Sequence, residues 1–102
     1  MRYLTFLFTL LAGPVLAADS IVLPRSQFGC RYLHDFHTYV TMVVQKDDVA
    51  RKRFVVEKQG DACTIEEAGT RMFLMRSDRR YGFQCLRPEG QTYCVWMSKW
   101  VE

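Results

Sequence analysis

Residues 53–97 read RFVVEKQGDACTIEEAGTRMFLMRSDRRYGFQCLRPEGQTYCVWM, and this stretch decides the expected fold. Short runs of β-branched and aromatic residues alternate in it with turn-forming residues. Runs of about 5 to 9 residues between such turns are typical of antiparallel strands joined by hairpins. The turns are expected at Gln59-Gly60, Ala68-Gly69, Ser77-Asp78 and around Glu89-Gly90.

These turns place compatible side chains across from one another. With the first turn in place, Arg53 faces Glu66 and Phe54 faces Ile65. Because neighbouring side chains on a strand point to opposite faces, a slip of one residue would invert every pair. The hairpins then share one apolar inward face, formed by Phe54, Val56, Cys63, Ile65, Met72, Leu74, Tyr81, Phe83, Cys85, Cys94 and Trp96.

Two further strands are expected upstream, over residues 28–34 and 38–46. In the second of these, Val40, Met42 and Val44 point to one side. No stretch of the chain keeps a helical hydrophobic period for three turns. The sequence therefore predicts an all-β domain, a small antiparallel meander of about six to seven strands. So many consecutive strands should close as a barrel or fold as a two-sheet sandwich.

Four cysteines should staple this domain. An even number in a small exported chain favours two disulfides over metal ligands, with a reversible redox pair as the alternative. Cys85 and Cys94 fall opposite each other across the last hairpin, within disulfide reach. That leaves Cys30 for Cys63, which would lie several strands apart in a meander, so their bond predicts that the sheet closes on itself.

Residues 1–17 carry the three parts of a secretory signal: Arg2, an apolar run, and the small-residue pattern ending at Ala17. Its removal leaves about 85 residues, enough for one modest core. Residues 18–27 hold Pro24 and are expected to be a lead-in segment outside the core, followed by a single β domain over residues 28–102. The mature chain is expected in the periplasm or outside the cell, without stable membrane insertion.

Charge and motifs exclude several classes of function. The formal net charge is +3, with acidic and basic residues interleaved, so the composition gives no sign of nucleic-acid binding. No GxSxG, glycine-rich phosphate loop or free cysteine beside a histidine is present, and we expect neither enzymatic activity nor a cofactor. Docking of an acidic partner stays open for the basic residues Arg51, Lys52, Arg53, Arg76, Arg79 and Arg80.

A metal-like cluster occurs at Cys30, His34, Asp35 and His37. Imidazoles bind zinc or copper readily, so His34 and His37 form the weaker, metal-binding alternative. Because Cys30 is expected to be oxidised, the two histidines are interpreted as residues that flank a turn.

The last hairpins also present a second face, opposite the inward one. An exposed apolar patch of this kind usually marks an interface. The alternative is that the lead-in segment or Trp100 and Val101 cover it. The predicted partner-binding residues are Arg71, Phe73, Met75, Leu86, Tyr93, Val95 and Met97.

The leading functional hypothesis is a small, non-enzymatic, exported protein-binding module, such as an inhibitor, an adaptor or an assembly factor. Its partner would be another exported protein. The alternatives are a carrier of a small ligand or metal, and a structural subunit of a homo-oligomer.

Overall fold

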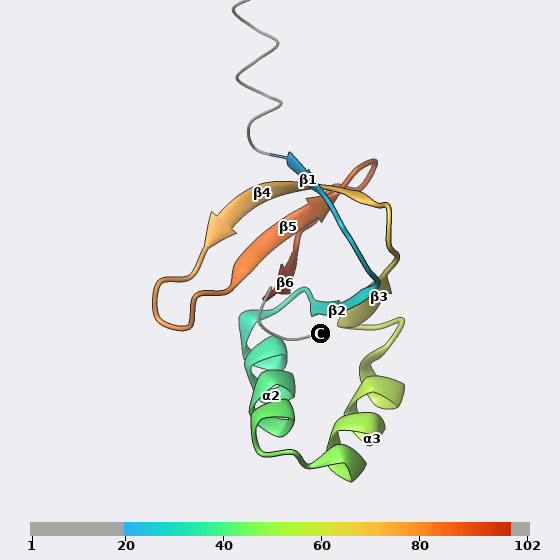
Figure 1. The fold of residues 1–102 in the computed structure, drawn as a ribbon, viewed down its shortest axis with the longest axis vertical. Helices are drawn as coiled ribbons and strands as arrows, with labels where there is room; N and C mark the ends of the chain where they lie inside the picture. Colours follow the sequence, from blue (N-terminus) through green and yellow to red (C-terminus); the bar gives the residue numbers. More distant parts are fainter. Residues whose placement is uncertain (1–19, 99–102) are drawn as a thin grey trace, which may run out of the picture.

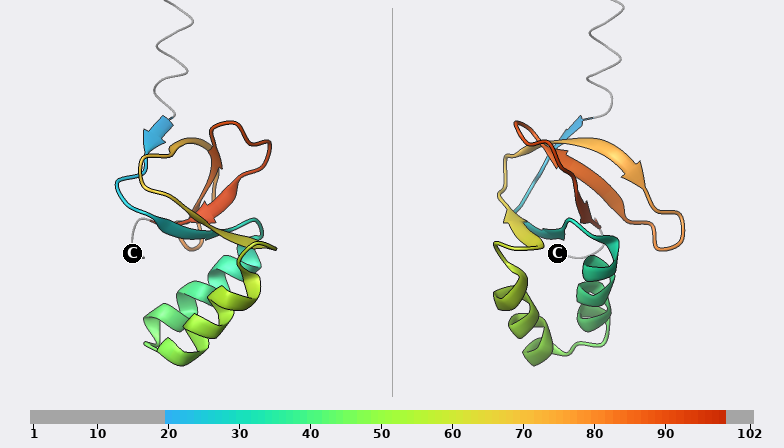
Figure 2. Two further views of the ribbon diagram at one scale, coloured as in Figure 1. Left: turned by 90° about the vertical axis from the view of Figure 1, so that its right-hand side faces the viewer. Right: turned by 180° about the vertical axis from the view of Figure 1, so that it is seen from behind.

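The computed structural model describes residues 20–98, so the predicted signal and the segment containing Trp100 and Val101 lie outside the described residues. The chain forms one antiparallel sheet with a pair of helices on one side of it (Figures 1 and 2). In chain order the elements are β1 (Ser20–Val22), β2 (Gln27–Cys30), α2 (Leu33–Val44), α3 (Asp48–Lys58), β3 (Cys63–Glu66), β4 (Arg71–Ser77), β5 (Gln84–Pro88) and β6 (Val95–Met97).

The six strands lie in the order β1-β4-β5-β6-β2-β3, and every paired neighbour is antiparallel. β1 and β3 are the two edges, so the sheet is open and the predicted barrel is not supported. The strand-rich antiparallel character and the two disulfides are confirmed. The meander holds only from β4 to β6, because β3 pairs with β2 and not with β4.

The prediction of a strand over residues 38–46 was wrong, because residues 38–44 belong to helix α2. Phe36, with 1% of its surface exposed, anchors the face that packs on the sheet, and Tyr39 and Val40 follow at helical spacing. The hydroxyl groups of Thr38 and Thr41 donate to the carbonyl oxygens four residues earlier, at 3.0 and 2.9 Å. Threonine, which usually favours strands, therefore finds its partners inside this helix.

Helix α3 replaces the strand expected before Gln59-Gly60. Asp47 is its N-cap and accepts a hydrogen bond from the amide of Ala50 at 3.1 Å. Phe54 is buried, whereas Val56 is 77% exposed, because a helix does not keep alternate residues on one face.

The core has two parts, one on each face of the sheet. Beneath the helices, Phe36 and Phe54 pack with Phe83, Trp96 and the disulfide sulfurs. The cluster on the opposite face consists of Leu23, Met72, Leu86, Val95 and Met97. The structure thus corrects the expectation that residues 18–27 contribute nothing to the core, because Leu23 is 2% exposed and β1 pairs with β4.

The predicted inward face is only partly inward. Phe54, Cys63, Phe83, Cys85 and Trp96 are buried beneath the helices, whereas Met72 is buried on the opposite face of the sheet. Val56, Ile65, Leu74 and Tyr81 are exposed. The turn at Ser77-Asp78 is longer than expected: the carboxylate of Asp78 accepts from the amide of Tyr81 at 2.8 Å, and its own amide donates to the carbonyl of Phe83. As a result, Leu74 pairs with Leu86 and not with Tyr81.

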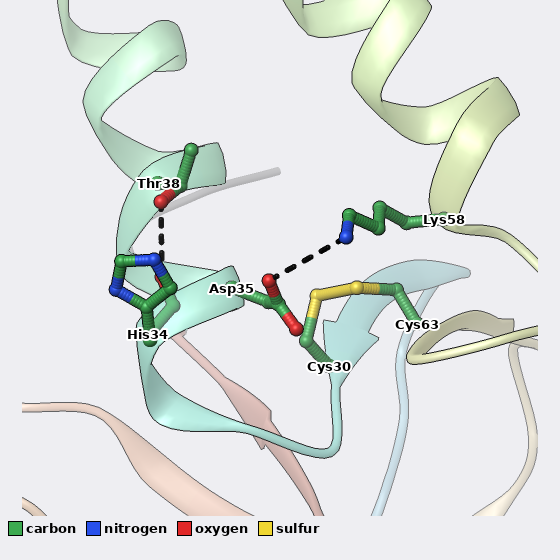
Figure 3. Close-up of a disulfide and its surroundings, with 6 residues drawn as sticks. All are labelled: Cys30, His34, Asp35, Thr38, Lys58 and Cys63. Atoms are coloured by element: carbon green, nitrogen blue, oxygen red, sulfur yellow. Dashed lines mark hydrogen bonds and ion pairs between the residues drawn. A yellow bond between two sulfur atoms is a disulfide. The ribbon is translucent and has the colours of Figure 1, made fainter.

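Both predicted disulfides, Cys30–Cys63 and Cys85–Cys94, are present. Cys30 and Cys63 are direct partners on the neighbouring strands β2 and β3, so their bond does not close the sheet (Figure 3). The intervening helices return the chain beside the strand that it left. Cys94 precedes β6, and Trp96 is the residue that pairs with Cys85, so the predicted register of this hairpin is off by two residues.

Candidate functional site

The predicted second face divides between core and surface. Leu86, Val95 and Met97 belong to the buried cluster that Leu23 completes, as in the alternative in which the lead-in segment covers this face. Leu74 pairs with Leu86 and Phe73 pairs with Arg87, so Phe73 and Leu86 point to opposite sides of the sheet. Arg71, Phe73, Met75 and Tyr93 remain at least partly exposed.

Two of these residues, Met75 and Tyr93, lie in a hollow of about 400 Å³ that we call the arginine cleft. Four separate segments build it: the junction of β2 and α2, strand β4, strand β5, and the chain before β6. Its lining consists of Arg31, Tyr32, Met75, Arg76, Arg87, Thr92, Tyr93 and Cys94.

Each arginine of the cleft lies over an aromatic ring. The guanidinium carbon is 4.5 Å from the ring centre of Tyr93 for Arg31, 5.4 Å from that of Trp96 for Arg76, and 4.8 Å from that of Phe73 for Arg87. Contacts of this length are cation–π interactions, which orient the charged group. Arg87 also donates to the carbonyl of Gln91 at 3.2 Å.

The charged side chains that line the cleft are all arginines. No carboxylate lines it, and within residues 20–98 none of its three arginines forms an ion pair. The ion pairs that this part of the chain shows, Arg51 with Asp48 and Lys58 with Asp35, both belong to the helical side. Arg76 donates to Sγ of Cys94 at 4.0 Å, and the three guanidinium groups keep further N–H groups that no carboxylate of residues 20–98 engages.

Arg71 and Phe73 relate to the cleft differently from the other predicted residues. Phe73 lies beneath Arg87 and supports its guanidinium group. Arg71 donates to the hydroxyl of Ser20 at 3.0 Å and does not line the cleft. Sequence reasoning missed Arg31 and Arg87 as site residues, although the correct register of β4 and β5 would have placed Arg87 beside Phe73.

The two histidines lie about one turn apart on α2 and have different surroundings. His34 is exposed, and its carbonyl accepts the Thr38 hydroxyl, while Asp35 points to Lys58 at 3.9 Å (Figure 3). His37 stacks on Tyr81 with 4.3 Å between ring centres. Within residues 20–98, no group of three or more His, Cys, Asp or Glu side chains is placed to bind a metal ion.

A second hollow, the α2 groove, has a volume of about 450 Å³ and a mainly apolar lining. It lies between the second half of α2 and the loop before β5, and Ser98 also lines it. The lining residues include His37, Val40, Thr41, Val44, Tyr81 and Phe83. Val44, at 71% exposure, leaves one wall open to solvent.

Comparison with known proteins gives no assignment: no family model matches the chain, and neither does any curated protein or solved structure. Over residues 20–98, neither helix is long and apolar enough to span a membrane. The features of residues 20–98 that bear on function are therefore the arginine cleft and the α2 groove.

Proposed function

We propose that this protein is a small, exported, non-enzymatic binding module that holds another exported protein at the arginine cleft. An inhibitor, an adaptor and an assembly factor all act in this way. The two disulfides are compatible with export, because such bonds persist in oxidising compartments.

One observation carries the proposal: the cleft combines arginines that form no ion pair within residues 20–98 with exposed apolar side chains. Tyr32 is 62% exposed and Met75 is 53% exposed at its rim. Arginine, tyrosine and methionine are enriched at protein interfaces, and the first two dominate binding hot spots. The cleft therefore has the composition of a recognition surface.

The chemistry of the lining also favours recognition over catalysis. It presents guanidinium, phenol, hydroxyl and thioether groups, together with a disulfide sulfur of Cys94. General acid–base catalysis usually relies on an imidazole or a carboxylate, and the cleft lining has neither. Binding of a partner needs only the groups that are in place.

Truncation of the exposed rim tests this function. Tyr32→Ala with Met75→Ala removes apolar surface from the cleft, and neither side chain is buried in the core. Tyr32 is the N-cap of α2, but its side chain makes no capping hydrogen bond. The matched control is Val49→Ala with Val56→Ala, which removes side chains that are 70% and 77% exposed on α3.

The measurement is quantitative capture of partners from the exported fraction of the native host, with each purified variant as bait. We expect the wild type and the α3 control to capture the same partner in similar amounts. The cleft variant should capture about tenfold less of it, or even less. Equal capture by the cleft variant and the α3 control would contradict the proposal.

The α2 groove supports a second candidate function, the carriage of a small apolar ligand. A hollow of about 450 Å³ falls within the range of small-molecule sites. The neutral dye N-phenyl-1-naphthylamine should then bind saturably, and Val44→Asp, at an exposed position of the wall, should abolish its fluorescence gain. A dye response that is unchanged in this variant would dismiss the groove as the carrier site.

The remaining alternative is a structural homo-oligomer. The size of the particle in solution distinguishes it from the binding module. If a second copy of the chain covers the cleft, sedimentation should give a dimer that Tyr32→Ala with Met75→Ala dissociates. A monomer that captures its partner through the cleft supports the binding module.

A further inference from the structure

The three arginines of the cleft converge on one hollow from three different elements. Arg31 follows β2, Arg76 belongs to β4, and Arg87 belongs to β5. Arg31 and Arg76 are exposed and Arg87 is half-buried, so a ligand can reach the charged groups. The aromatic rings beneath them hold the side chains in place, which reduces the entropy lost on binding.

Within residues 20–98, no carboxylate lines the hollow and no ion pair involves its arginines. Asp61 lines a neighbouring hollow together with Arg31 and Tyr93, but it forms no ion pair with a cleft arginine. Tyr32, the N-cap of α2, lies in the cleft lining, so this helix begins beside the arginines. The N-terminus of a helix carries partial positive charge, which adds to the attraction for an anion.

We infer that the arginine cleft binds an acidic segment of the partner protein. Its carboxylates meet the guanidinium groups of Arg31, Arg76 and Arg87, and an apolar side chain between them rests on Tyr32 and Met75. Guanidinium groups match carboxylates in geometry and form their strongest hydrogen bonds with them. This inference rests on the proposed function and names the chemistry of the partner at the same site.

The shape of the site favours a peptide over other polyanions. A hollow of about 400 Å³ with three arginines suits a few side chains, whereas nucleic acids and anionic membranes are usually met by extended basic surfaces. The exposed thioether and phenol groups add apolar contacts that a sulfate or phosphate ion would not use. Single-stranded DNA and anionic vesicles therefore serve as competing probes.

The first measurement is fluorescence anisotropy of the intact, disulfide-bonded mature protein. The probe is a labelled peptide in which Glu alternates with Tyr, and its matched control carries Gln at every Glu position. The Glu peptide should bind at least about tenfold more tightly than the Gln peptide at low salt, and added salt should remove the difference.

Charge variants then locate the site. Arg31→Gln and Arg76→Gln should each weaken binding of the Glu peptide by about threefold to tenfold. Lys52→Gln and Arg53→Gln remove the same charge from exposed positions of α3 and should change it by less than about twofold. Thermal melts that match the wild type confirm that the variants remain folded.

Three results overturn the inference: equal affinity for the Glu and Gln peptides, equal losses from the cleft and α3 variants, or tighter binding of a single-stranded oligonucleotide or of phosphatidylglycerol vesicles. Partner capture that depends on Tyr32 and Met75, combined with no preference for the Glu peptide, leaves the proposed function standing and removes this inference alone. Capture that is independent of the cleft removes the proposed function itself.

Discussion

Gly29, on β2, lies close to Met97 and Trp96 of β6. A Cβ atom at this position would lie 3.0 Å from Cγ of Met97 and 3.1 Å from the carbonyl oxygen of Trp96. Gly29→Ala should therefore force β2 and β6 apart and lower the free energy of unfolding by about 1–3 kcal/mol. Urea denaturation measures this loss, with Gln27→Ala on the same strand as the control. A variant as stable as the wild type would show that these strands lie further apart.

Glu66, at the end of the edge strand β3, is a source of pH dependence. Partial burial raises the pKa of its carboxyl group above the ordinary 4.5. The folded state therefore holds the proton more tightly than the unfolded state, and the ionised carboxylate costs stability at neutral pH. That cost is relieved as pH falls through the raised pKa toward the ordinary one.

Glu66→Gln should accordingly raise the urea midpoint at pH 7, and its advantage over the wild type should shrink as the pH approaches 4.5. Glu67→Gln, at the exposed neighbouring position, provides the control. An advantage that grows as the pH falls would contradict the assigned direction of the pKa shift.

Lys46, two residues after the end of α2, has a left-handed backbone conformation that is unfavourable for lysine. Lys46 has φ 58°, its amide donates to the carbonyl of Val43, and the amide of Asp47 donates to that of Met42. These two bonds form a Schellman motif, in which glycine is preferred at the left-handed position. Lys46→Gly should stabilise the protein by about 0.5–1 kcal/mol, and Lys46→Val should destabilise it. Thermal melting of both variants measures the effects, and a less stable glycine variant would contradict this assignment.

The helices show why the sequence pattern predicted strands where helices form. Residues 38–44 are rich in threonine and valine, which favour strands when considered alone. The tertiary contacts of Phe36 and Tyr39 with Phe28 and Phe83 override this preference. Asp47 was a readable signal, because an aspartate that precedes a helical segment is a common N-cap.

The turns at Ala68-Gly69 and Glu89-Gly90 and the cysteine pairs could be predicted, whereas the strand registers could not. Glu89-Gly90 is a turn, and both cysteine pairs are as expected. A bulge between Leu74 and Arg76 and the long loop after Ser77 shift the pairing of β4 with β5. Because each shift changes which side chains share a face, Leu86 moved into the core while Met75 and Tyr93 stayed at the site.

The whole molecule is a helical pair secured to an open sheet. The Cys30–Cys63 disulfide closes the loop that contains both helices, with a sequence separation of 33 residues, whereas Cys85–Cys94 spans 9. Loop length predicts a contribution of about 4 kcal/mol from the first bond and about 3 kcal/mol from the second. Cys30→Ala with Cys63→Ala should therefore lower the free energy of unfolding more than Cys85→Ala with Cys94→Ala.

Urea denaturation of the two paired variants under non-reducing conditions measures this order. The same experiment tests how the helices depend on the first bond, because far-ultraviolet circular dichroism should show greater loss of helical signal in Cys30→Ala with Cys63→Ala. The reverse order of stability would contradict the view that this bond secures the helical pair.

For the molecule as a whole, we propose that the arginine cleft is the surface that meets the partner. A photo-crosslinking amino acid placed at Met75, in the cleft, and at Val56, on α3, reports contact at each exposed position directly in the native compartment. Met75 should crosslink to an acidic segment of one exported protein, and Val56 should not. Crosslinking of that protein from Val56 and not from Met75 would contradict this proposal.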